Sequence, residues 1–214
     1  MSKLKRKFKQ GVRRRLRDRK FISVFGVILL CASIVSYAVY MDTRRRTVDP
    51  TTYRPLLNLI ADVESKGNYN AHFGNPGNTA TVFTKMTIEE VQQWQAKFIS
   101  QGNASSAVGR YQFIDTTLSG LVEQLDISSK QKFDQNTQDT LAIALLERRG
   151  SEKYVNDELT SEQFAANLAM EWAALPKILG ENPNNSYYDG DGLNKSLVSP
   201  REVLQAINVI TPKV

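Results

Sequence analysis

The chain contains almost no cysteine or histidine. Among its 214 residues, Cys31 is the only cysteine and His72 the only histidine. A lone cysteine excludes an intramolecular disulfide, and a lone histidine argues against a His-ligated zinc site. The stretch at 189–192 (DGDG) begins like a calcium loop, but Leu193 and Pro200 occupy positions that need oxygen ligands. We therefore expect no cofactor and no metal ion.

Charge is absent from residues 21–41. A helix of this length is long enough to cross the ~30 Å hydrocarbon core of a bilayer. Eleven Lys and Arg residues lie within 1–20, and the positive-inside rule then places the N-terminus in the cytoplasm. The sequence predicts a single-pass membrane protein with a basic cytoplasmic tail (1–20), a transmembrane helix (21–41), a linker (42–52) and a periplasmic or extracellular domain (53–214).

Three other interpretations of the apolar run stay open. Residues 36–38 (SYA) resemble a signal-peptidase site, so the run is also compatible with a cleaved signal peptide. It is compatible as well with an anchor that later leaves the bilayer, or with a buried core helix, although it has no polar face.

The basic tail at 1–20 is compatible with two classes of partner, nucleic acid and membrane lipid. Clusters of Lys and Arg bind phosphates without sequence preference, so a cytoplasmic nucleic-acid protein is one alternative. Membrane topology and attraction to anionic lipids explain the same charges, and residues 47–214 carry twenty acidic against fourteen basic residues. We expect membrane lipid, contacted through residues 21–41, and not nucleic acid.

The domain at 53–214 has the pattern of a mainly α protein with five or six helices. Thr87 and Glu90, and again Thr160 and Gln163, have the spacing of a capping box at a helix start. The exception is residues 68–85, rich in Gly, Asn, Pro and Thr, where 79–83 (TATVF) is expected to form one strand of a small β-hairpin.

Glu64 is the first candidate for chemistry. It lies at the end of a predicted helix, beside the apolar positions Leu57 and Ile60. Partial burial and the negative end of the helix dipole would both raise the pKa of its carboxyl group. A carboxyl group that stays protonated near neutral pH can protonate a glycosidic oxygen. An ordinary surface glutamate near a helix end has the same pattern.

Several short motifs follow in a fixed order. Glu64-Ser65 precedes the irregular stretch, and 109–114 (GRYQFI) comes about forty residues later with Thr116-Thr117 after it. Further pieces lie at 137–150 and 172–176. In order and spacing, residues 55–180 resemble the lysozyme superfamily, and most closely the phage lambda-type endolysins, which are lytic transglycosylases.

The resemblance implies an α+β lysozyme-like fold and a set of roles. Glu64 matches the catalytic acid of the family, and Tyr111 and Gln112 match positions that line its saccharide groove. We expect Ser65 and Arg110 to bind substrate as well, and the substrate would be the glycan strands of peptidoglycan. Tyr111 is also compatible with core packing, and Arg110 with pairing to a structural acid.

Acidic residues are absent between Glu64 and Glu89. A hydrolysing glycosidase needs a second carboxylate about 5–9.5 Å from the acid, whereas a lytic transglycosylase does not. The gap favours cleavage of the MurNAc-β-1,4-GlcNAc bond with formation of a 1,6-anhydro product. A hydrolytic lysozyme (muramidase) is the close alternative, and an inactive peptidoglycan-binding or virion structural membrane protein is the alternative from another class. The anchor suits phage lysis, a virion membrane component or bacterial wall remodelling.

Overall fold

Short helices make up the fold. The computed structural model describes residues 45–192 and 194–213. In chain order the elements are the 3-10 helix η1 (Pro50–Tyr53), α2 (Arg54–Ser65), the 3-10 helix η2 (Phe83–Lys85), α3 (Ile88–Ser100), α4 (Asp115–Gln124), α5 (Gln135–Arg148), α6 (Ser151–Val155), α7 (Ser161–Ala169) and α8 (Pro200–Ile207).

The helix starts follow the capping residues. Thr87 accepts a hydrogen bond from the Glu90 amide at 3.2 Å, and the Glu90 carboxylate accepts one from the Thr87 amide at 2.6 Å. Thr160 and Gln163 form the same reciprocal pair at the start of α7. These bonds confirm both predicted capping boxes. The boxes could be predicted from the sequence because each depends only on two residues three positions apart.

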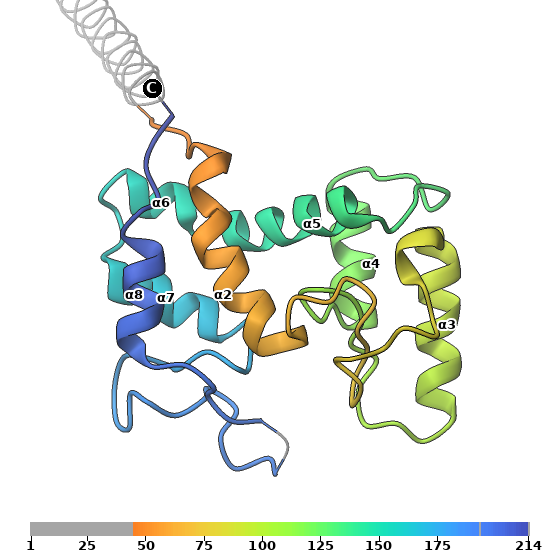
Figure 1. Cartoon of the computed structure of the whole chain (residues 1–214). Coiled ribbons are helices and arrows are strands. Elements are labelled where there is room, and N and C mark those ends of the chain that lie inside the picture. The colour runs from red at the N-terminus through yellow and green to blue at the C-terminus, as the bar shows by residue number, and fades with distance from the viewer. Residues whose placement is uncertain (1–44, 193, 214) are drawn as a thin grey trace, which may run out of the picture. The chain divides into compact units, whose positions relative to one another are not determined.

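The helices gather into two groups joined by α5, which runs across the domain in Figure 1. Helix α8 packs against α2 and α7 in one group, and α3 packs against α4 in the other. Residues 46–214 belong to one unit, and its buried apolar core includes Leu56 and Ile60 of α2, Leu141 and Leu145 of α5 and Leu168 of α7. The end of α2 and the irregular segment after it therefore lie where the two groups meet.

The predicted β-hairpin is wrong. Among the described residues there are isolated β-bridges but no strand, and residues 83–85 of the expected strand region form η2. Side-chain amides hold this segment instead of a strand ladder. Asn78 donates to the carbonyl oxygens of Asn70 and Thr81, and Asn70 accepts from the amide of Thr84 at 3.0 Å. The fold is mainly α, and the α+β expectation is corrected accordingly.

The expected membrane topology also needs correction. A spanning helix needs about 20 apolar residues, whereas the longest helix within 45–192 and 194–213 is α5, with 14 residues. No helix in this part of the chain is long and apolar enough to cross a membrane. This finding is against the predicted single-pass localisation as far as the described residues are concerned. The segment on which that prediction rested, residues 21–41, lies outside the described residues, as does the basic tail.

Candidate active site

Glu64 lies in the last turn of α2. Lys66 ends the helix by adopting a left-handed conformation, with φ of 55°, and Gly67 follows at 75°. The amide of Gly67 donates to the carbonyl of Ala61 at 3.0 Å, and that of Lys66 to Asp62 at 3.2 Å. This left-handed cap satisfies carbonyl oxygens in the last turns of α2. It stops the helix one residue after Ser65 and turns the chain away, which leaves the Glu64 side chain at the edge of a cavity.

The surroundings of Glu64 favour its protonated form. Desolvation by the surrounding protein raises the pKa of the carboxyl group from 4.5 to about 7, and a hydrogen bond from the Ala174 amide, at 3.4 Å, opposes the rise. The side chain is still partly exposed, because solvent reaches the carboxyl group through the cavity while protein atoms surround it on the other sides. Glu64 can therefore give up a proton near neutral pH.

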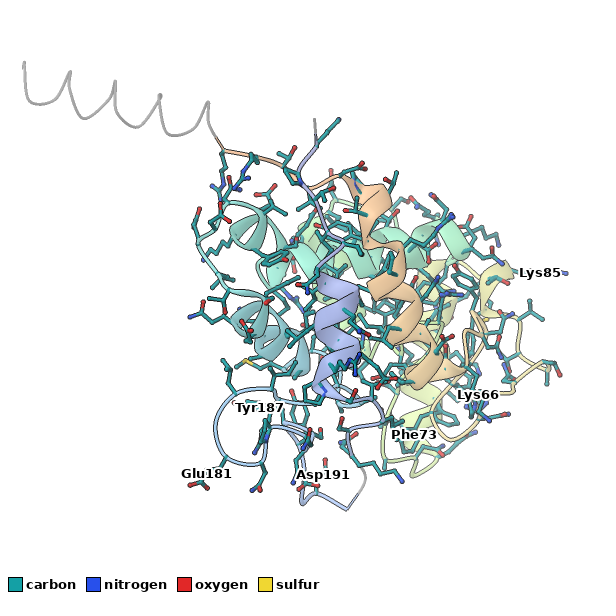
Figure 2. The ribbon with its side chains drawn as sticks, turned by 60° about the vertical axis from the view of Figure 1, so that its left-hand side comes forward. Lys66, Phe73, Lys85, Glu181, Tyr187 and Asp191 are labelled. Carbon is teal, nitrogen blue, oxygen red and sulfur yellow. The ribbon has the colours of Figure 1, made fainter. Side chains whose placement is uncertain are left out.

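The cavity beside Glu64 has a volume of about 570 Å³ and nearly equal polar and apolar character. Its walls come from distant parts of the chain. Phe73 belongs to the segment after α2, Gln112 to the turn before α4, and Trp172 and Tyr188 to the segment after α7. In Figure 2 the irregular segments that carry Phe73 and Asp191 reach the same end of the domain, beyond the end of α2. A cavity of this size and lining suits a polar ligand such as a saccharide.

Ser65 is fully buried and does not line this cavity. Its hydroxyl donates to the carbonyl oxygen of Arg110 at 2.7 Å and to that of Ala61 at 3.1 Å. The hydroxyl therefore joins the end of α2 to the 109–112 turn, next to Glu64.

The three other predicted substrate-binding residues are consecutive, but they face two different cavities. Gln112 lines the Glu64 cavity, whereas Arg110 and Tyr111 line a second cavity of about 690 Å³. Gln112 has a φ of 53°, and the nitrogen of its side-chain amide donates to the Gly109 carbonyl at 2.8 Å. Such a conformation is costly for a residue with a side chain, and here it turns Gln112 towards Glu64.

Side chains of α5 hold the 109–112 turn in place. The side-chain oxygen of Gln138 accepts from the Arg110 amide at 2.8 Å, and the carboxylate of Asp139 accepts from the Tyr111 hydroxyl at 2.7 Å. Gly109 has a φ of 78°, and a Cβ atom there would lie 2.4 Å from the Gln138 side-chain oxygen. The sequence motif thus contains a glycine where the backbone approaches α5 too closely for any other residue.

Glu171 and Ala174 are site residues that the sequence analysis missed. Glu171 lines the Glu64 cavity with a side chain only 7% exposed, and Arg148 and Arg149 bind its carboxylate at 3.1 and 2.8 Å. Glu171 lies more than one hundred residues after Glu64 in the sequence, and the chain returns to the site only after α7. The nearby motif at 172–176 was the available signal.

Trp172 is the first residue of the 172–176 motif. It is 3% exposed and lines the cavity, and its indole nitrogen donates to the Tyr111 carbonyl at 3.2 Å. Trp172 therefore connects the wall of the cavity to the turn that carries Gln112.

The residues of the acid-free stretch after Glu64 mostly stabilise the loop. Asn70 and Asn78 hold the loop, and His72 packs against Trp94 and Phe98 with ring centroids 5.3 and 5.2 Å apart. None of these side chains lines the Glu64 cavity. Within residues 45–192 and 194–213, no group of three or more His, Cys, Asp or Glu side chains is placed to hold a metal ion.

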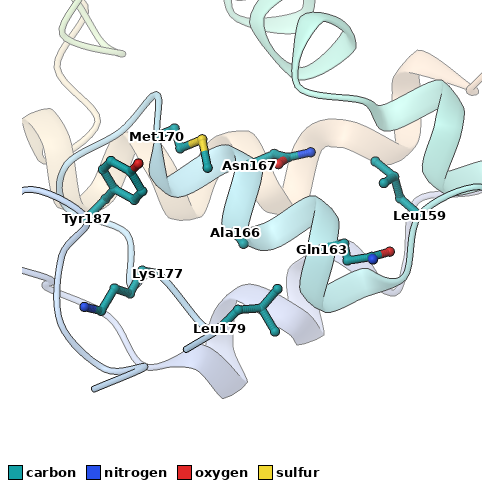
Figure 3. Close-up of a pocket in the computed structure, with 8 residues that line it drawn as sticks. All are labelled: Leu159, Gln163, Ala166, Asn167, Met170, Lys177, Leu179 and Tyr187. Carbon is teal, nitrogen blue, oxygen red and sulfur yellow. The ribbon is translucent and has the colours of Figure 1, made fainter. Parts of the chain in front are cut away.

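A third cavity, of about 390 Å³, lies beside α7 (Figure 3). Its lining is mostly apolar, with Leu159, Met170 and Leu179, and Lys177 and Tyr187 are its ionisable residues. None of the described residues that line it has a carboxyl group that could protonate a glycosidic oxygen.

Comparison with known proteins gives one family. Residues 54–189 match a family model described as Endolysin, which is more than half of the 214-residue chain. No curated protein and no solved structure matches the chain. The matched segment runs from the start of α2, which carries Glu64, through the 109–112 turn to Tyr188 on the cavity wall.

Proposed function

From the premise that the chain belongs to the endolysin family, the phage enzymes that degrade peptidoglycan, we propose that it is a lytic transglycosylase. It cleaves the β-1,4 bond between N-acetylmuramic acid and N-acetylglucosamine, with Glu64 as its one acid and base. The observation that carries the proposal is the Glu64 carboxyl group, whose pKa burial raises to about 7, at the edge of a cavity where the one other carboxylate among the described lining residues, that of Glu171, is bound by two arginines.

The reaction needs one carboxyl group that acts twice. Glu64 gives its proton to the glycosidic oxygen as the bond from that oxygen to C1 of the muramoyl residue breaks. The Glu64 carboxylate then removes the proton from the C6 hydroxyl, and O6 bonds to C1 to close the 1,6-anhydro ring. Glu64 ends protonated, as it began, and no water is consumed. A pKa of about 7 suits both steps, because the group must lose and regain a proton near neutral pH.

Glu171 is the residue on which the hydrolytic alternative depends. It is the other Asp or Glu among the described residues that line the Glu64 cavity. Both of its oxygens lie 3.1 Å from Arg148, and Arg149 lies 2.8 Å from one of them. Because guanidinium groups already bind both carboxylate oxygens, Glu171 is poorly placed to activate a water molecule or to attack the anomeric carbon, which supports the transglycosylase over a muramidase.

The binding roles divide along the 109–112 turn. Gln112 presents its amide to the substrate cavity and can bond to the N-acetyl or hydroxyl groups of a saccharide. Ser65 and Tyr111 fix the turn relative to Glu64, through the Arg110 carbonyl and the Asp139 carboxylate respectively. We assign Arg110 to the second cavity.

Mass spectrometry of digested peptidoglycan tests the proposal. The expected products end in 1,6-anhydro-N-acetylmuramic acid, and products that end in reducing N-acetylmuramic acid would establish the muramidase instead. In a zymogram, Glu64→Gln should give no clearing, whereas Glu171→Gln should still yield anhydro products. Clearing by Glu64→Gln would remove Glu64 from the mechanism. Absence of clearing by the unmodified protein would favour an inactive binding module.

A further inference from the structure

The second cavity lies on the other side of the 109–112 turn from Glu64. It has a volume of about 690 Å³ and is lined by residues of α2, α5 and the turn. The cavity shares the turn with the catalytic site, since Tyr111 lines it while the Tyr111 carbonyl accepts from Trp172, a wall residue of the Glu64 cavity. A polymer bound beside Glu64 therefore has a second cavity within reach across one turn.

Two guanidinium groups line this cavity, and neither pairs with a carboxylate among the residues that the structure describes. Arg110 donates to the Gly67 carbonyl at 3.1 Å and to the Asn58 side-chain oxygen at 2.8 Å, both neutral acceptors. Among the described residues, the Nε of Arg110 has no hydrogen-bond partner, and Arg54 makes neither a side-chain hydrogen bond nor an ion pair with them. By contrast, Arg149 pairs with a carboxylate at 2.8 Å.

The two cations are neighbours. Arg54 and Asn58 are four residues apart on α2, so their side chains extend from the same face, about 5–6 Å apart at Cβ. Because Asn58 binds the Arg110 guanidinium, Arg110 lies within one helical turn of Arg54. The Arg110 guanidinium is held in place by the Tyr69 ring, whose centroid lies 4.9 Å away.

The one acidic residue among the described residues that line the cavity is Asp139. Its carboxylate accepts from the hydroxyls of Tyr69, at 2.9 and 3.1 Å, and of Tyr111, at 2.7 Å. Asp139 therefore holds the two tyrosines in place while the guanidinium groups keep their charge available to a ligand. An anion that binds both groups would gain charge-assisted, bidentate hydrogen bonds.

We propose that this second cavity binds the carboxylate-bearing peptide stems of peptidoglycan, with Arg54 and Arg110 as the recognising groups. The stems are attached to the muramoyl residues, so a glycan strand in the Glu64 cavity brings them close to the turn. The inference rests on peptidoglycan being the substrate and not on the transglycosylase chemistry.

Calorimetric titration of the full chain with a synthetic, sugar-free stem tetrapeptide tests this proposal. The unmodified protein should bind the peptide. The peptide with every carboxylate converted to a carboxamide should bind at least about tenfold more weakly. Arg54→Gln should weaken binding of the carboxylate form by about tenfold. Arg54 is exposed, so circular dichroism should show an unchanged fold.

Arg201→Gln is the matched control, because Arg201 is an exposed arginine of α8 that does not line the cavity. It should bind the peptide as the unmodified protein does. No measurable binding by the unmodified protein, equal binding of the two peptides, or equal effects of the Arg54 and Arg201 substitutions would each overturn the proposal. The titration involves no glycan cleavage, so reducing-end products would refute the transglycosylase and leave this result unaffected.

Discussion

Replacing Glu64 with glutamine should make the folded protein more stable at alkaline pH while abolishing its activity. The carboxyl group has a pKa of about 7 in the folded protein against the usual 4.5, and burial is the main cause. At about 1.36 kcal/mol for each pH unit, this difference corresponds to roughly 3 kcal/mol. Glutamine keeps the size and the acceptor oxygen of the side chain but cannot ionise, so it avoids this cost.

The pH dependence separates this effect from a general gain in packing. Between pH 4.5 and about 7 the folded protein holds the Glu64 proton more tightly than the unfolded chain does. The stability of the unmodified protein therefore falls as the pH rises through this window, and the full cost is present above it. The gain from Glu64→Gln should be close to zero near pH 4 and complete near pH 8.

Urea unfolding monitored by tryptophan fluorescence, at about pH 4 and about pH 8, measures the two gains. At the higher pH the gain of roughly 3 kcal/mol corresponds to a rise in Tm of about 6–12 °C. Glu123→Gln provides the control, since Glu123 is an exposed residue of α4 and its substitution should change stability by less than about 0.5 kcal/mol at either pH. Equal gains for Glu64→Gln at both pH values, or a loss near pH 8, would refute the reasoning.

Three further predictions concern the same site. The kcat/KM for peptidoglycan should fall about tenfold per pH unit above about pH 7, as Glu64 loses its proton, and initial rates across pH would show it. Arg149→Leu should cost about 2 kcal/mol in urea unfolding, because the buried Glu171 carboxylate loses a charge-assisted bond; an unchanged midpoint would contradict this. Gly109→Ala should cost about 2–5 kcal/mol and reduce activity, because its Cβ would collide with α5. Gly102 is also left-handed but has open space around it, so Gly102→Ala should lower the free energy of unfolding by only about 1–2 kcal/mol.

Features that depend on neighbouring residues could be predicted from the sequence. The capping boxes at Thr87 and Thr160 lie where expected, and α2 ends close to Gly67. The partial burial of Glu64 beside the apolar face of α2 was expected from the spacing of Leu57 and Ile60, and the pKa raised by desolvation agrees with that reasoning. Such features depend on residues within one or two helical turns, so the order of the sequence contains the information.

The strand prediction from local sequence pattern was wrong where side chains, and not a neighbouring strand, bind the backbone. Residues 79–83 have the composition of a strand, but Asn70 and Asn78 bind the backbone of this segment and hold it as a loop. Helix α6, of five residues, was not predicted, because it is too short to show a helical period and begins after Gly150 at a φ of 106°.

Sequence alone selected Glu64 and the motif around Gln112, but only the tertiary structure decided which residues share a cavity. Three consecutive residues of one motif divide between two cavities, because the 109–112 turn is anchored from α5 and presents its side chains to both sides. Glu171 joins Glu64 in the same cavity from near the far end of the matched segment, and Arg148 and Arg149 bind its carboxylate. Neither fact can be predicted from spacing, because each depends on contacts between residues that are distant in the chain.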